Sequence, residues 1–138
     1  MQLTCSYIID KERLPQILLH QDGLIAQSNS PYYLLIYSTR SQYTKITIYP
    51  VTTIPIRKYF IRGETFTQES VKELHSQLTG YHPTILHTSG IVLDSPKYIY
   101  EIYFSGVNDT DIKYLTQELI QIQGIDSIED FIIAPLEN

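Results

Sequence analysis

The chain has 138 residues, of which 43% are hydrophobic. It is therefore long enough for one ordinary domain or two very small ones, and apolar enough to exclude wholesale disorder. Lys and Arg number 10 against 15 Asp and Glu, a formal net charge of −5. This balance argues against a dedicated nucleic-acid-binding protein, because such proteins neutralise phosphates with positive charge.

Two features of the sequence indicate the cellular compartment: the single cysteine and the residues at the start of the chain. Cys5 is the single cysteine and cannot form an intramolecular disulfide, which favours a reducing compartment. Residues 1–9 carry no positive charge ahead of their apolar stretch, so we interpret them as a strand and not as a signal peptide. No apolar run reaches the roughly 18–20 residues that span a bilayer. We expect a cytoplasmic protein that does not bind membranes.

Several segments combine β-branched and aromatic residues between turn-forming residues, which is typical of β-strands. They are 2–9, 32–39, 43–51, 56–62, 84–93, 97–105 and 127–133. Asp94-Ser95-Pro96 has the chemistry of a turn and predicts an antiparallel hairpin between segments 84–93 and 97–105. Ser41-Gln42 is a similar connection between segments 32–39 and 43–51.

Two further segments show the 3.6-residue period of an amphipathic helix. Their apolar stripes are Val71, Leu74 and Leu78 in the first, and Ile112, Leu115, Leu119 and Ile122 in the second. At the helix starts we expect a capping box of Thr65 with Gln68 and an N-cap at Asn108. At the helix ends, Gly80 and Gly124 stand where a left-handed residue is favoured.

Each of these helices stands between two strands. Residues 53–135 thus contain two β-α-β units of nearly equal length, joined by a hairpin. Two right-handed units connected in this way give the split β-α-β, or ferredoxin-like, sandwich. We therefore predict an α+β protein with a βαββαβ order, whose antiparallel sheet carries both helices on one face.

Residues 1–52 form a β-rich extension ahead of that unit. They supply strands and a short helix over 11–20, in which Pro15 is interior unless the helix begins near Arg13. Such a segment is too small for an independent core. We expect it to extend or cover the C-terminal sheet, so that residues 1–138 form a single domain. Edge-to-edge pairing and face-to-face packing both remain open.

The end of the second unit carries a family resemblance. Gly124 follows an apolar helix end, and the aliphatic residue Ile125 is repeated three positions later as Ile128. Over about residues 55–134 the chain resembles ACT-type regulatory domains, and also the ligand-binding domains of leucine-responsive-type regulators. The resemblance implies a small regulatory domain with a ligand site in the turn after its first strand.

That turn is Arg62-Gly63-Glu64-Thr65, which has the glycine of the family's acidic-x-Pro-Gly-aliphatic pattern but not its proline. Gly63, Glu64 and Thr65, together with Arg62, are the predicted ligand-binding residues. Backbone N–H groups at a helix start can host an anion, although the Glu64 carboxylate opposes one. A capped turn without any ligand is the alternative interpretation.

Other chemistry-bearing side chains have simpler explanations. The histidines are His20, His75, His82 and His87, and none has the spacing of a metal-binding motif. The carboxylates Asp126, Glu129 and Asp130, with Asp109 and Asp111, could serve a divalent cation or an acid pair. Helix capping and a solvated surface explain them without further assumptions. We predict no catalytic residue, no metal site and no cofactor.

Tyrosine is the compositional exception, with 12 residues of which ten fall in predicted strands. A tyrosine-lined open sheet face could stack RNA bases, or could be buried against a second sheet or a dimer partner. Ordinary strand propensity is the first explanation of the tyrosines, an interface the second and RNA stacking the third. The acidic balance and the missing Gly-flanked aromatic signature weigh against RNA.

The predicted function is non-enzymatic and regulatory. We expect a homodimer that senses a small metabolite or docks a protein partner. The alternative is an enzyme, or an accessory subunit of one, with a pocket on the open sheet face and positive charge from Arg57 and Arg62. Charge is unevenly spread, since residues 23–63 carry +5 and residues 105–138 carry −6. Such a distribution favours recognition over catalysis.

Overall fold

The computed structural model describes residues 2–14, 29–65, 67–93 and 96–136, and all structural statements below concern these residues. The chain divides into two compact units. The first comprises Met1–Ile54 with Ile133–Asn138, and the second comprises Pro55–Ile132. Whether residues 1–138 behave as a single domain stays a prediction.

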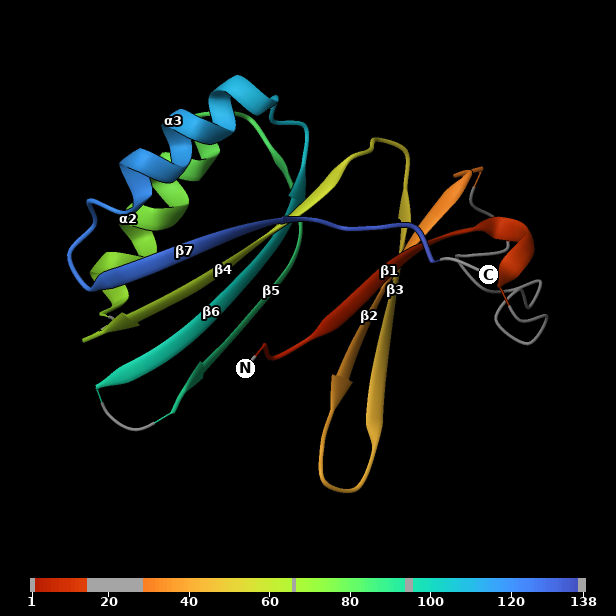
Figure 1. Cartoon of the computed structure of the whole chain (residues 1–138), viewed down its shortest axis with the longest axis horizontal. Coiled ribbons are helices and arrows are strands. Elements are labelled where there is room, and N and C mark those ends of the chain that lie inside the picture. Colours follow the sequence, from red (N-terminus) through yellow and green to blue (C-terminus); the bar gives the residue numbers. More distant parts are fainter. Residues whose placement is uncertain (1, 15–28, 66, 94–95, 137–138) are drawn as a thin grey trace. The chain divides into compact units, whose positions relative to one another are not determined.

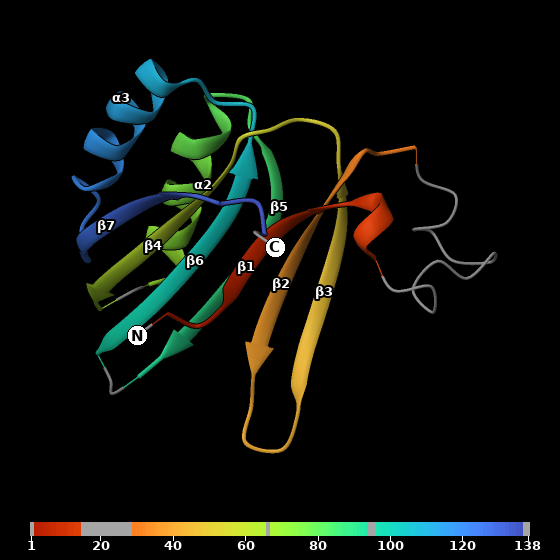
Figure 2. The same ribbon diagram turned by 45° about the vertical axis from the view of Figure 1, so that its right-hand side comes forward.

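The second unit has the predicted βαββαβ order. Its elements are β4 (Ile56–Glu64), α2 (Gln68–Thr79), β5 (Thr84–Val92), β6 (Lys97–Ser105), α3 (Asp109–Leu119) and β7 (Ile125–Ile132). The strands are antiparallel in the order β5-β6-β4-β7. Both helices lie on one face of this sheet (Figure 1), and the turned view shows the same arrangement (Figure 2). The α+β, ferredoxin-like fold class is confirmed.

The core of this unit lies between the sheet and the two helices. Tyr59 and Ile61 point from β4 toward the helices, because side chains alternate between the faces of a strand. They meet a cluster of fully buried helix residues, which are Leu74 and Leu78 of α2 and Leu115 and Leu119 of α3. The apolar stripes expected from the sequence therefore face the sheet.

The helix ends differ in part from the prediction. Asn108 caps α3 as expected, accepting a hydrogen bond from the Asp111 N–H at 2.8 Å. The cap of α2 is Thr67 and not Thr65, since the Thr67 hydroxyl accepts from the Ser70 N–H at 3.1 Å. The left-handed position expected at Gly80 was also wrong, because Gly80 has a helical φ of −59°. His82 takes the positive φ, at 54°.

The first unit is a three-stranded antiparallel sheet. It consists of β1 (Cys5–Asp10), β2 (Tyr32–Thr39) and β3 (Thr44–Val51), in the order β1-β2-β3. Of the helix expected over 11–20, the described part shows only one 3-10 turn, η1 (Lys11–Arg13). The α-helical prediction is wrong at Leu14, which is extended, and residues 15–20 lie outside the described residues.

The face of the four-stranded sheet opposite α2 and α3, here called the helix-free face, carries an ion pair. Lys58 Nζ lies 3.1 Å from Glu101 Oε2, and the two side chains are only 2% and 0% exposed. The same ammonium stands 5.3 Å from the ring centroid of Tyr103. Tyr98 and Tyr100 point instead to the helix side. Strand alternation therefore leaves Tyr103 alone among the β6 tyrosines on the helix-free face, which is not lined with tyrosine along this strand.

The buried ion pair leads to a first prediction. Lys58→Met or Glu101→Leu alone leaves a buried charge without its partner and should cost about 3–5 kcal/mol of unfolding free energy. The double variant should lose less than the sum of the two, with a coupling of at least about 1 kcal/mol. Urea unfolding of the full chain measures all four proteins. Strictly additive losses would show that the two charges do not stabilise each other.

Candidate functional site

The predicted ligand turn begins at a point of close backbone approach. The Gly124 carbonyl oxygen accepts two hydrogen bonds, from the Glu64 N–H at 2.9 Å and from the Tyr98 hydroxyl at 2.8 Å. Gly63 lies against both partners, and a Cβ on it would overlap the Gly124 oxygen and the Tyr98 ring. The packing around Gly63 therefore leaves no room for a side chain. Because glycine has none, β4, β6 and the α3–β7 turn can lie together.

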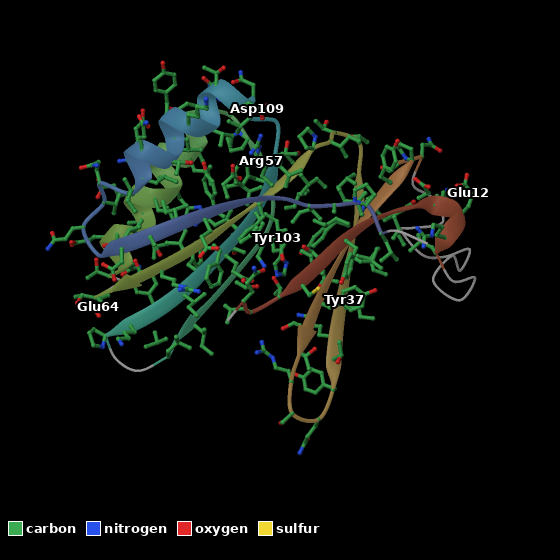
Figure 3. All side chains as sticks on the ribbon, in the orientation of Figure 1. Glu12, Tyr37, Arg57, Glu64, Tyr103 and Asp109 are labelled. Carbon is green, nitrogen blue, oxygen red and sulfur yellow. The ribbon has the colours of Figure 1, made fainter. Side chains whose placement is uncertain are left out.

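A pocket of about 380 Å³ opens beside this point, between the end of β4, the first turns of α2 and the α3–β7 turn. Its described lining is polar throughout. It comprises the carboxylates Glu64, Glu69 and Glu73, the hydroxyls Thr65, Thr67 and Ser70, and the loop residues Gln123 and Gly124. Glu64 and Thr65 of the predicted set thus line a pocket. Glu64 lies at the far end of β4 from Arg57 (Figure 3).

The pocket has a strongly negative character. Three of its described lining residues are carboxylates and none is Lys or Arg. The N-terminus of α2 offers a partial positive charge of about half a unit, and one of its free N–H groups is already bound by Thr67. Three full negative charges outweigh that dipole. Binding of an anion at this helix start is therefore unfavourable, and the three carboxylates of the pocket favour a cation.

The Ser70 side chain and the Thr65 backbone fix the wall of the pocket. The Ser70 hydroxyl donates to the Gln123 carbonyl oxygen at 3.2 Å and lies 3.1 Å from the Thr67 hydroxyl. Thr65 has a φ of 57°, a conformation that is unusual for a β-branched residue. Its N–H donates to the Pro96 carbonyl oxygen at 2.9 Å. The pocket wall is thereby tied to both neighbouring connections of the sheet.

The two arginines singled out from the sequence lie on opposite faces of β4. Arg62 extends over the helix-free face, where its guanidinium carbon lies 4.9 Å from the Phe60 ring centroid. It does not line the pocket that Glu64 and Thr65 share. Arg57 lies on the helix side, so the expectation that it places charge near an open sheet face is wrong.

Arg57 instead links α3 and β7 from a buried position, although the side chain of its α3 partner, Asp109, is 86% exposed. Its side chain is 5% exposed and donates to the carboxylates of Asp130, at 2.8 Å, and Asp109. Figure 3 shows Arg57 and Asp109 side by side. Burial raises the pKa of Asp130 more than the Arg57 charge lowers it. Helix capping and a solvated surface were the predicted explanations of Asp109 and Asp130. Ion pairs with Arg57 replace these explanations in part.

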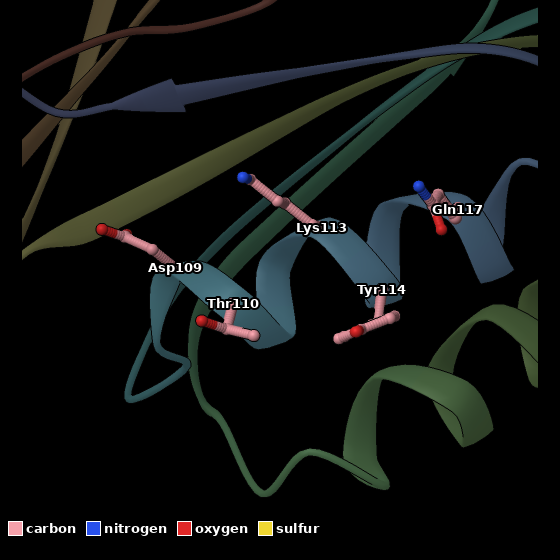
Figure 4. Close-up of a pocket in the computed structure, with 5 residues that line it drawn as sticks. All are labelled: Asp109, Thr110, Lys113, Tyr114 and Gln117. Atoms are coloured by element: carbon pink, nitrogen blue, oxygen red, sulfur yellow. The ribbon is translucent and has the colours of Figure 1, made fainter.

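A second hollow lies along α3 alone. Its five described lining residues come from successive turns of that helix and are all exposed: Asp109, Thr110, Lys113, Tyr114 and Gln117 (Figure 4). Because a single helix forms it and Asp109 is engaged with Arg57, this hollow offers little enclosure. The pocket at the β4–α2 connection is the better candidate.

The histidines, carboxylates and helices in the part of the chain that the structure describes bear on metal binding and on membrane spanning. No group of three His, Cys, Asp or Glu side chains there could hold a metal ion. His75 is hydrogen-bonded to the Tyr100 hydroxyl at 2.9 Å, and His87 to the Ser89 hydroxyl at 2.9 Å. Within the same residues, every helix is too short or too polar to cross a bilayer.

Of the eight described lining residues, only Glu64 and Thr65 were predicted from the sequence as ligand-binding residues. Glu69, Glu73 and Gln123 were not singled out. Glu69 and Glu73 are four residues apart, a spacing that places them on one helix face, and this signal was available once α2 was predicted. The approach of Gln123 depends on how closely the α3–β7 turn lies to α2, which no local sequence pattern gives.

Comparisons with known proteins describe the fold only. No protein-family model matches this chain, and no curated protein matches it. Similar solved structures include the ACT domain of GTP pyrophosphokinase from Chlorobium tepidum, at 15% identity and a TM-score of 0.49, covering 57% of this chain and 100% of that one. The C-terminal domain of MgtC from Mycobacterium tuberculosis has 8% identity and a TM-score of 0.48, covering 57% and 87%.

A homoserine dehydrogenase from Thiobacillus denitrificans is also similar, with 7% identity and a TM-score of 0.46, covering 85% of this chain and 37% of that one. An ACT domain is thus among the solved structures that this chain resembles, as predicted from the sequence. Identities this low transfer no ligand or activity to this chain.

The close approach at Gly63 yields a second prediction. Gly63→Ala should lower the free energy of unfolding by about 1–3 kcal/mol or more, because the new methyl group forces apart the Gly124 carbonyl and the Tyr98 ring. Gly80→Ala is the matched control, since Gly80 is exposed and already helical. It should change the stability by only a few tenths of a kcal/mol. Equal losses in the two variants would contradict the packing argument.

Tyr98 yields a third prediction, which concerns alkaline pH. Burial raises the pKa of Tyr98 from 10.0 to about 12. The native state therefore keeps its proton between pH 10 and about 12 while the unfolded state loses it, so stability must fall as the pH rises through this window. Urea unfolding at a series of pH values should show a shallower fall for Tyr98→Phe. An unchanged slope would exclude Tyr98 as a contributor.

Proposed function

We propose that this protein is a non-enzymatic regulatory protein that acts as a homodimer and binds a small organic cation in the pocket between β4 and α2. One observation carries the proposal. The pocket combines three carboxylates with hydroxyl and amide groups, and its described lining contains no positive charge. A ligand with one or two ammonium groups and few acidic groups fits this chemistry.

Two properties favour an organic cation over a metal ion. Metal ions need several oxygen ligands converging at about 2.0–2.6 Å, and the described acidic side chains form no group that could hold one. A volume of about 380 Å³ instead matches the small-molecule pockets of proteins. Separated carboxylates suit a ligand whose charges are several ångströms apart, such as a diamine.

The same lining disfavours acids and free amino acids. A ligand carboxylate in this pocket would meet Glu64, Glu69 and Glu73 without a compensating Lys or Arg among the described lining residues. Unpaired like charges at such distances are costly. The preference for amines therefore rests on the charge of the pocket and not on the fold that the chain shares with other proteins.

A thermal unfolding titration tests this proposal, with 1,4-diaminobutane as the probe. A ligand present at ten times its dissociation constant stabilises the native state by about 1.4 kcal/mol, which should raise the melting temperature by a few degrees. Glutarate, a dicarboxylate of similar length, should produce no rise. A response to glutarate alone, or to neither compound, would overturn the assignment of a cation.

Charge-matched variants locate the effect. Glu64→Gln with Glu73→Gln should abolish the response to 1,4-diaminobutane. Glu12→Gln with Glu129→Gln removes the same number of charges from exposed positions outside the pocket and should leave the response intact. Loss of the response in both double variants would indicate a general effect of net charge.

A further inference from the structure

The three carboxylates of the pocket come from two of its walls. Glu64 stands at the end of β4, whereas Glu69 and Glu73 stand on the first and second turns of α2. Residues four apart in a helix lie on one face, with Cβ atoms about 5–6 Å apart. The helix therefore sets two of the three negative charges side by side, and the third comes from the neighbouring strand end.

No basic side chain neutralises these charges within the part of the chain that the structure describes. None of the three glutamates takes part in an ion pair between described residues. Lys72, the basic residue of α2, is not among the described lining residues. Glu73 accepts a long hydrogen bond from Gln77, at 3.4 Å. Because like charges four residues apart destabilise a helix, α2 carries a repulsion that a bound cation relieves.

A diamine leaves one of the three carboxylates without a partner. It brings two positive charges, and the α2 dipole adds only about half a charge to oppose three negative charges. A third ammonium group completes the balance. In an extended chain with covalent bonds of about 1.5 Å, nitrogens separated by three or four methylenes lie about 5–6 Å apart. This is also the separation of neighbouring side chains on one face of α2.

We infer that the ligand of this pocket is a linear triamine, whose central ammonium pairs with Glu69 and whose terminal ammonium groups pair with Glu64 and Glu73. This inference rests on the proposed function for the binding of an organic cation. Glu69 takes the central group because it lies between the other two glutamates in chain order, on the turn of α2 that follows the β4–α2 connection. Glu73 is its neighbour on the same helix face.

The lining near the first turn of α2 favours a nitrogen over a methylene at the centre of the ligand. The Ser70 hydroxyl lies 3.1 Å from that of Thr67 and donates to the Gln123 carbonyl oxygen at 3.2 Å. Oxygen atoms of this kind have two acceptor positions each, so they can also accept from a secondary ammonium, which has two N–H donors. A methylene group in the same place would take these oxygens out of water without a hydrogen bond in return.

Isothermal titration calorimetry of the full chain with three amines tests the inference. Spermidine is a linear triamine with spacers of three and four methylenes, and 1,8-diaminooctane has the same length with a methylene in place of the central nitrogen. The third probe is 1,4-diaminobutane. The dissociation constant for spermidine should be at least about tenfold lower than that for either diamine, because the central ammonium adds a charge-assisted hydrogen bond.

Single-charge variants assign this preference to the pocket. Glu69→Gln should remove it, so that spermidine and 1,8-diaminooctane bind with similar affinity. Glu12→Gln removes one charge from an exposed position outside the described lining and should preserve it. Circular dichroism checks that both variants are folded. Loss of the preference in both variants, or in neither, would overturn the pairing with Glu69.

The same titrations separate this inference from the proposed function. Equal affinity of the wild type for spermidine and 1,8-diaminooctane, with a measurable response to 1,4-diaminobutane, would overturn the triamine and leave the organic cation in place. No response to any of the three amines would overturn both. A preference for spermidine that Glu69→Gln removes would support the triamine, even in a protein that fails to bind 1,4-diaminobutane.

Discussion

The second unit depends on the close approach of backbone and ring at Gly63. Because Gly63 has no side chain, the Tyr98 hydroxyl and the Glu64 N–H can both donate to one acceptor, the Gly124 carbonyl oxygen. These bonds join β6 and β4 to the turn that leads into β7. The same approach brings Gln123 beside the first turn of α2. The pocket lies where β4, β6 and the α3–β7 turn come together, and these hydrogen bonds hold its walls in place.

The negative charge of the pocket depends on which polar groups these hydrogen bonds already occupy. Backbone donors near α2 are spent on Thr67 and on the Gly124 and Pro96 carbonyls, so few remain to attract an anion. The side chains of Glu64, Glu69 and Glu73 are exposed, and Glu73 also accepts a hydrogen bond from Gln77 of the same helix at 3.4 Å. Exposed side chains gathered around a pocket are available for recognition. The negative charge of the pocket therefore depends on where these three carboxylates lie, more than on the net charge of the chain.

Features that depend on neighbouring residues were predicted from the sequence more completely than features that depend on contacts between distant segments. The elements of the βαββαβ unit follow from local periodicity, as Leu74, Leu78, Leu115 and Leu119 all face the core. The N-cap at Thr67 was missed by two residues, since Thr65 has an equally suitable hydroxyl and only the pairing of β4 decides between them. Arg57 and Arg62 share a sequence neighbourhood but point to opposite faces, a difference set by strand alternation. Gln123 and the Lys58–Glu101 pair depend on contacts between distant segments, which no local pattern contains.

The pocket and the β5–β6 connection are joined by a backbone hydrogen bond. The Thr65 N–H donates to the Pro96 carbonyl oxygen at 2.9 Å, and Pro96 belongs to the connection that follows the exposed end of β5. Thr65 holds a positive φ, which costs a non-glycine residue on the order of 1–3 kcal/mol and persists only while its surroundings enforce it. A ligand that contacts Thr65 in the pocket therefore acts on the β5–β6 connection as well, because the Thr65 N–H is bound to the Pro96 carbonyl oxygen.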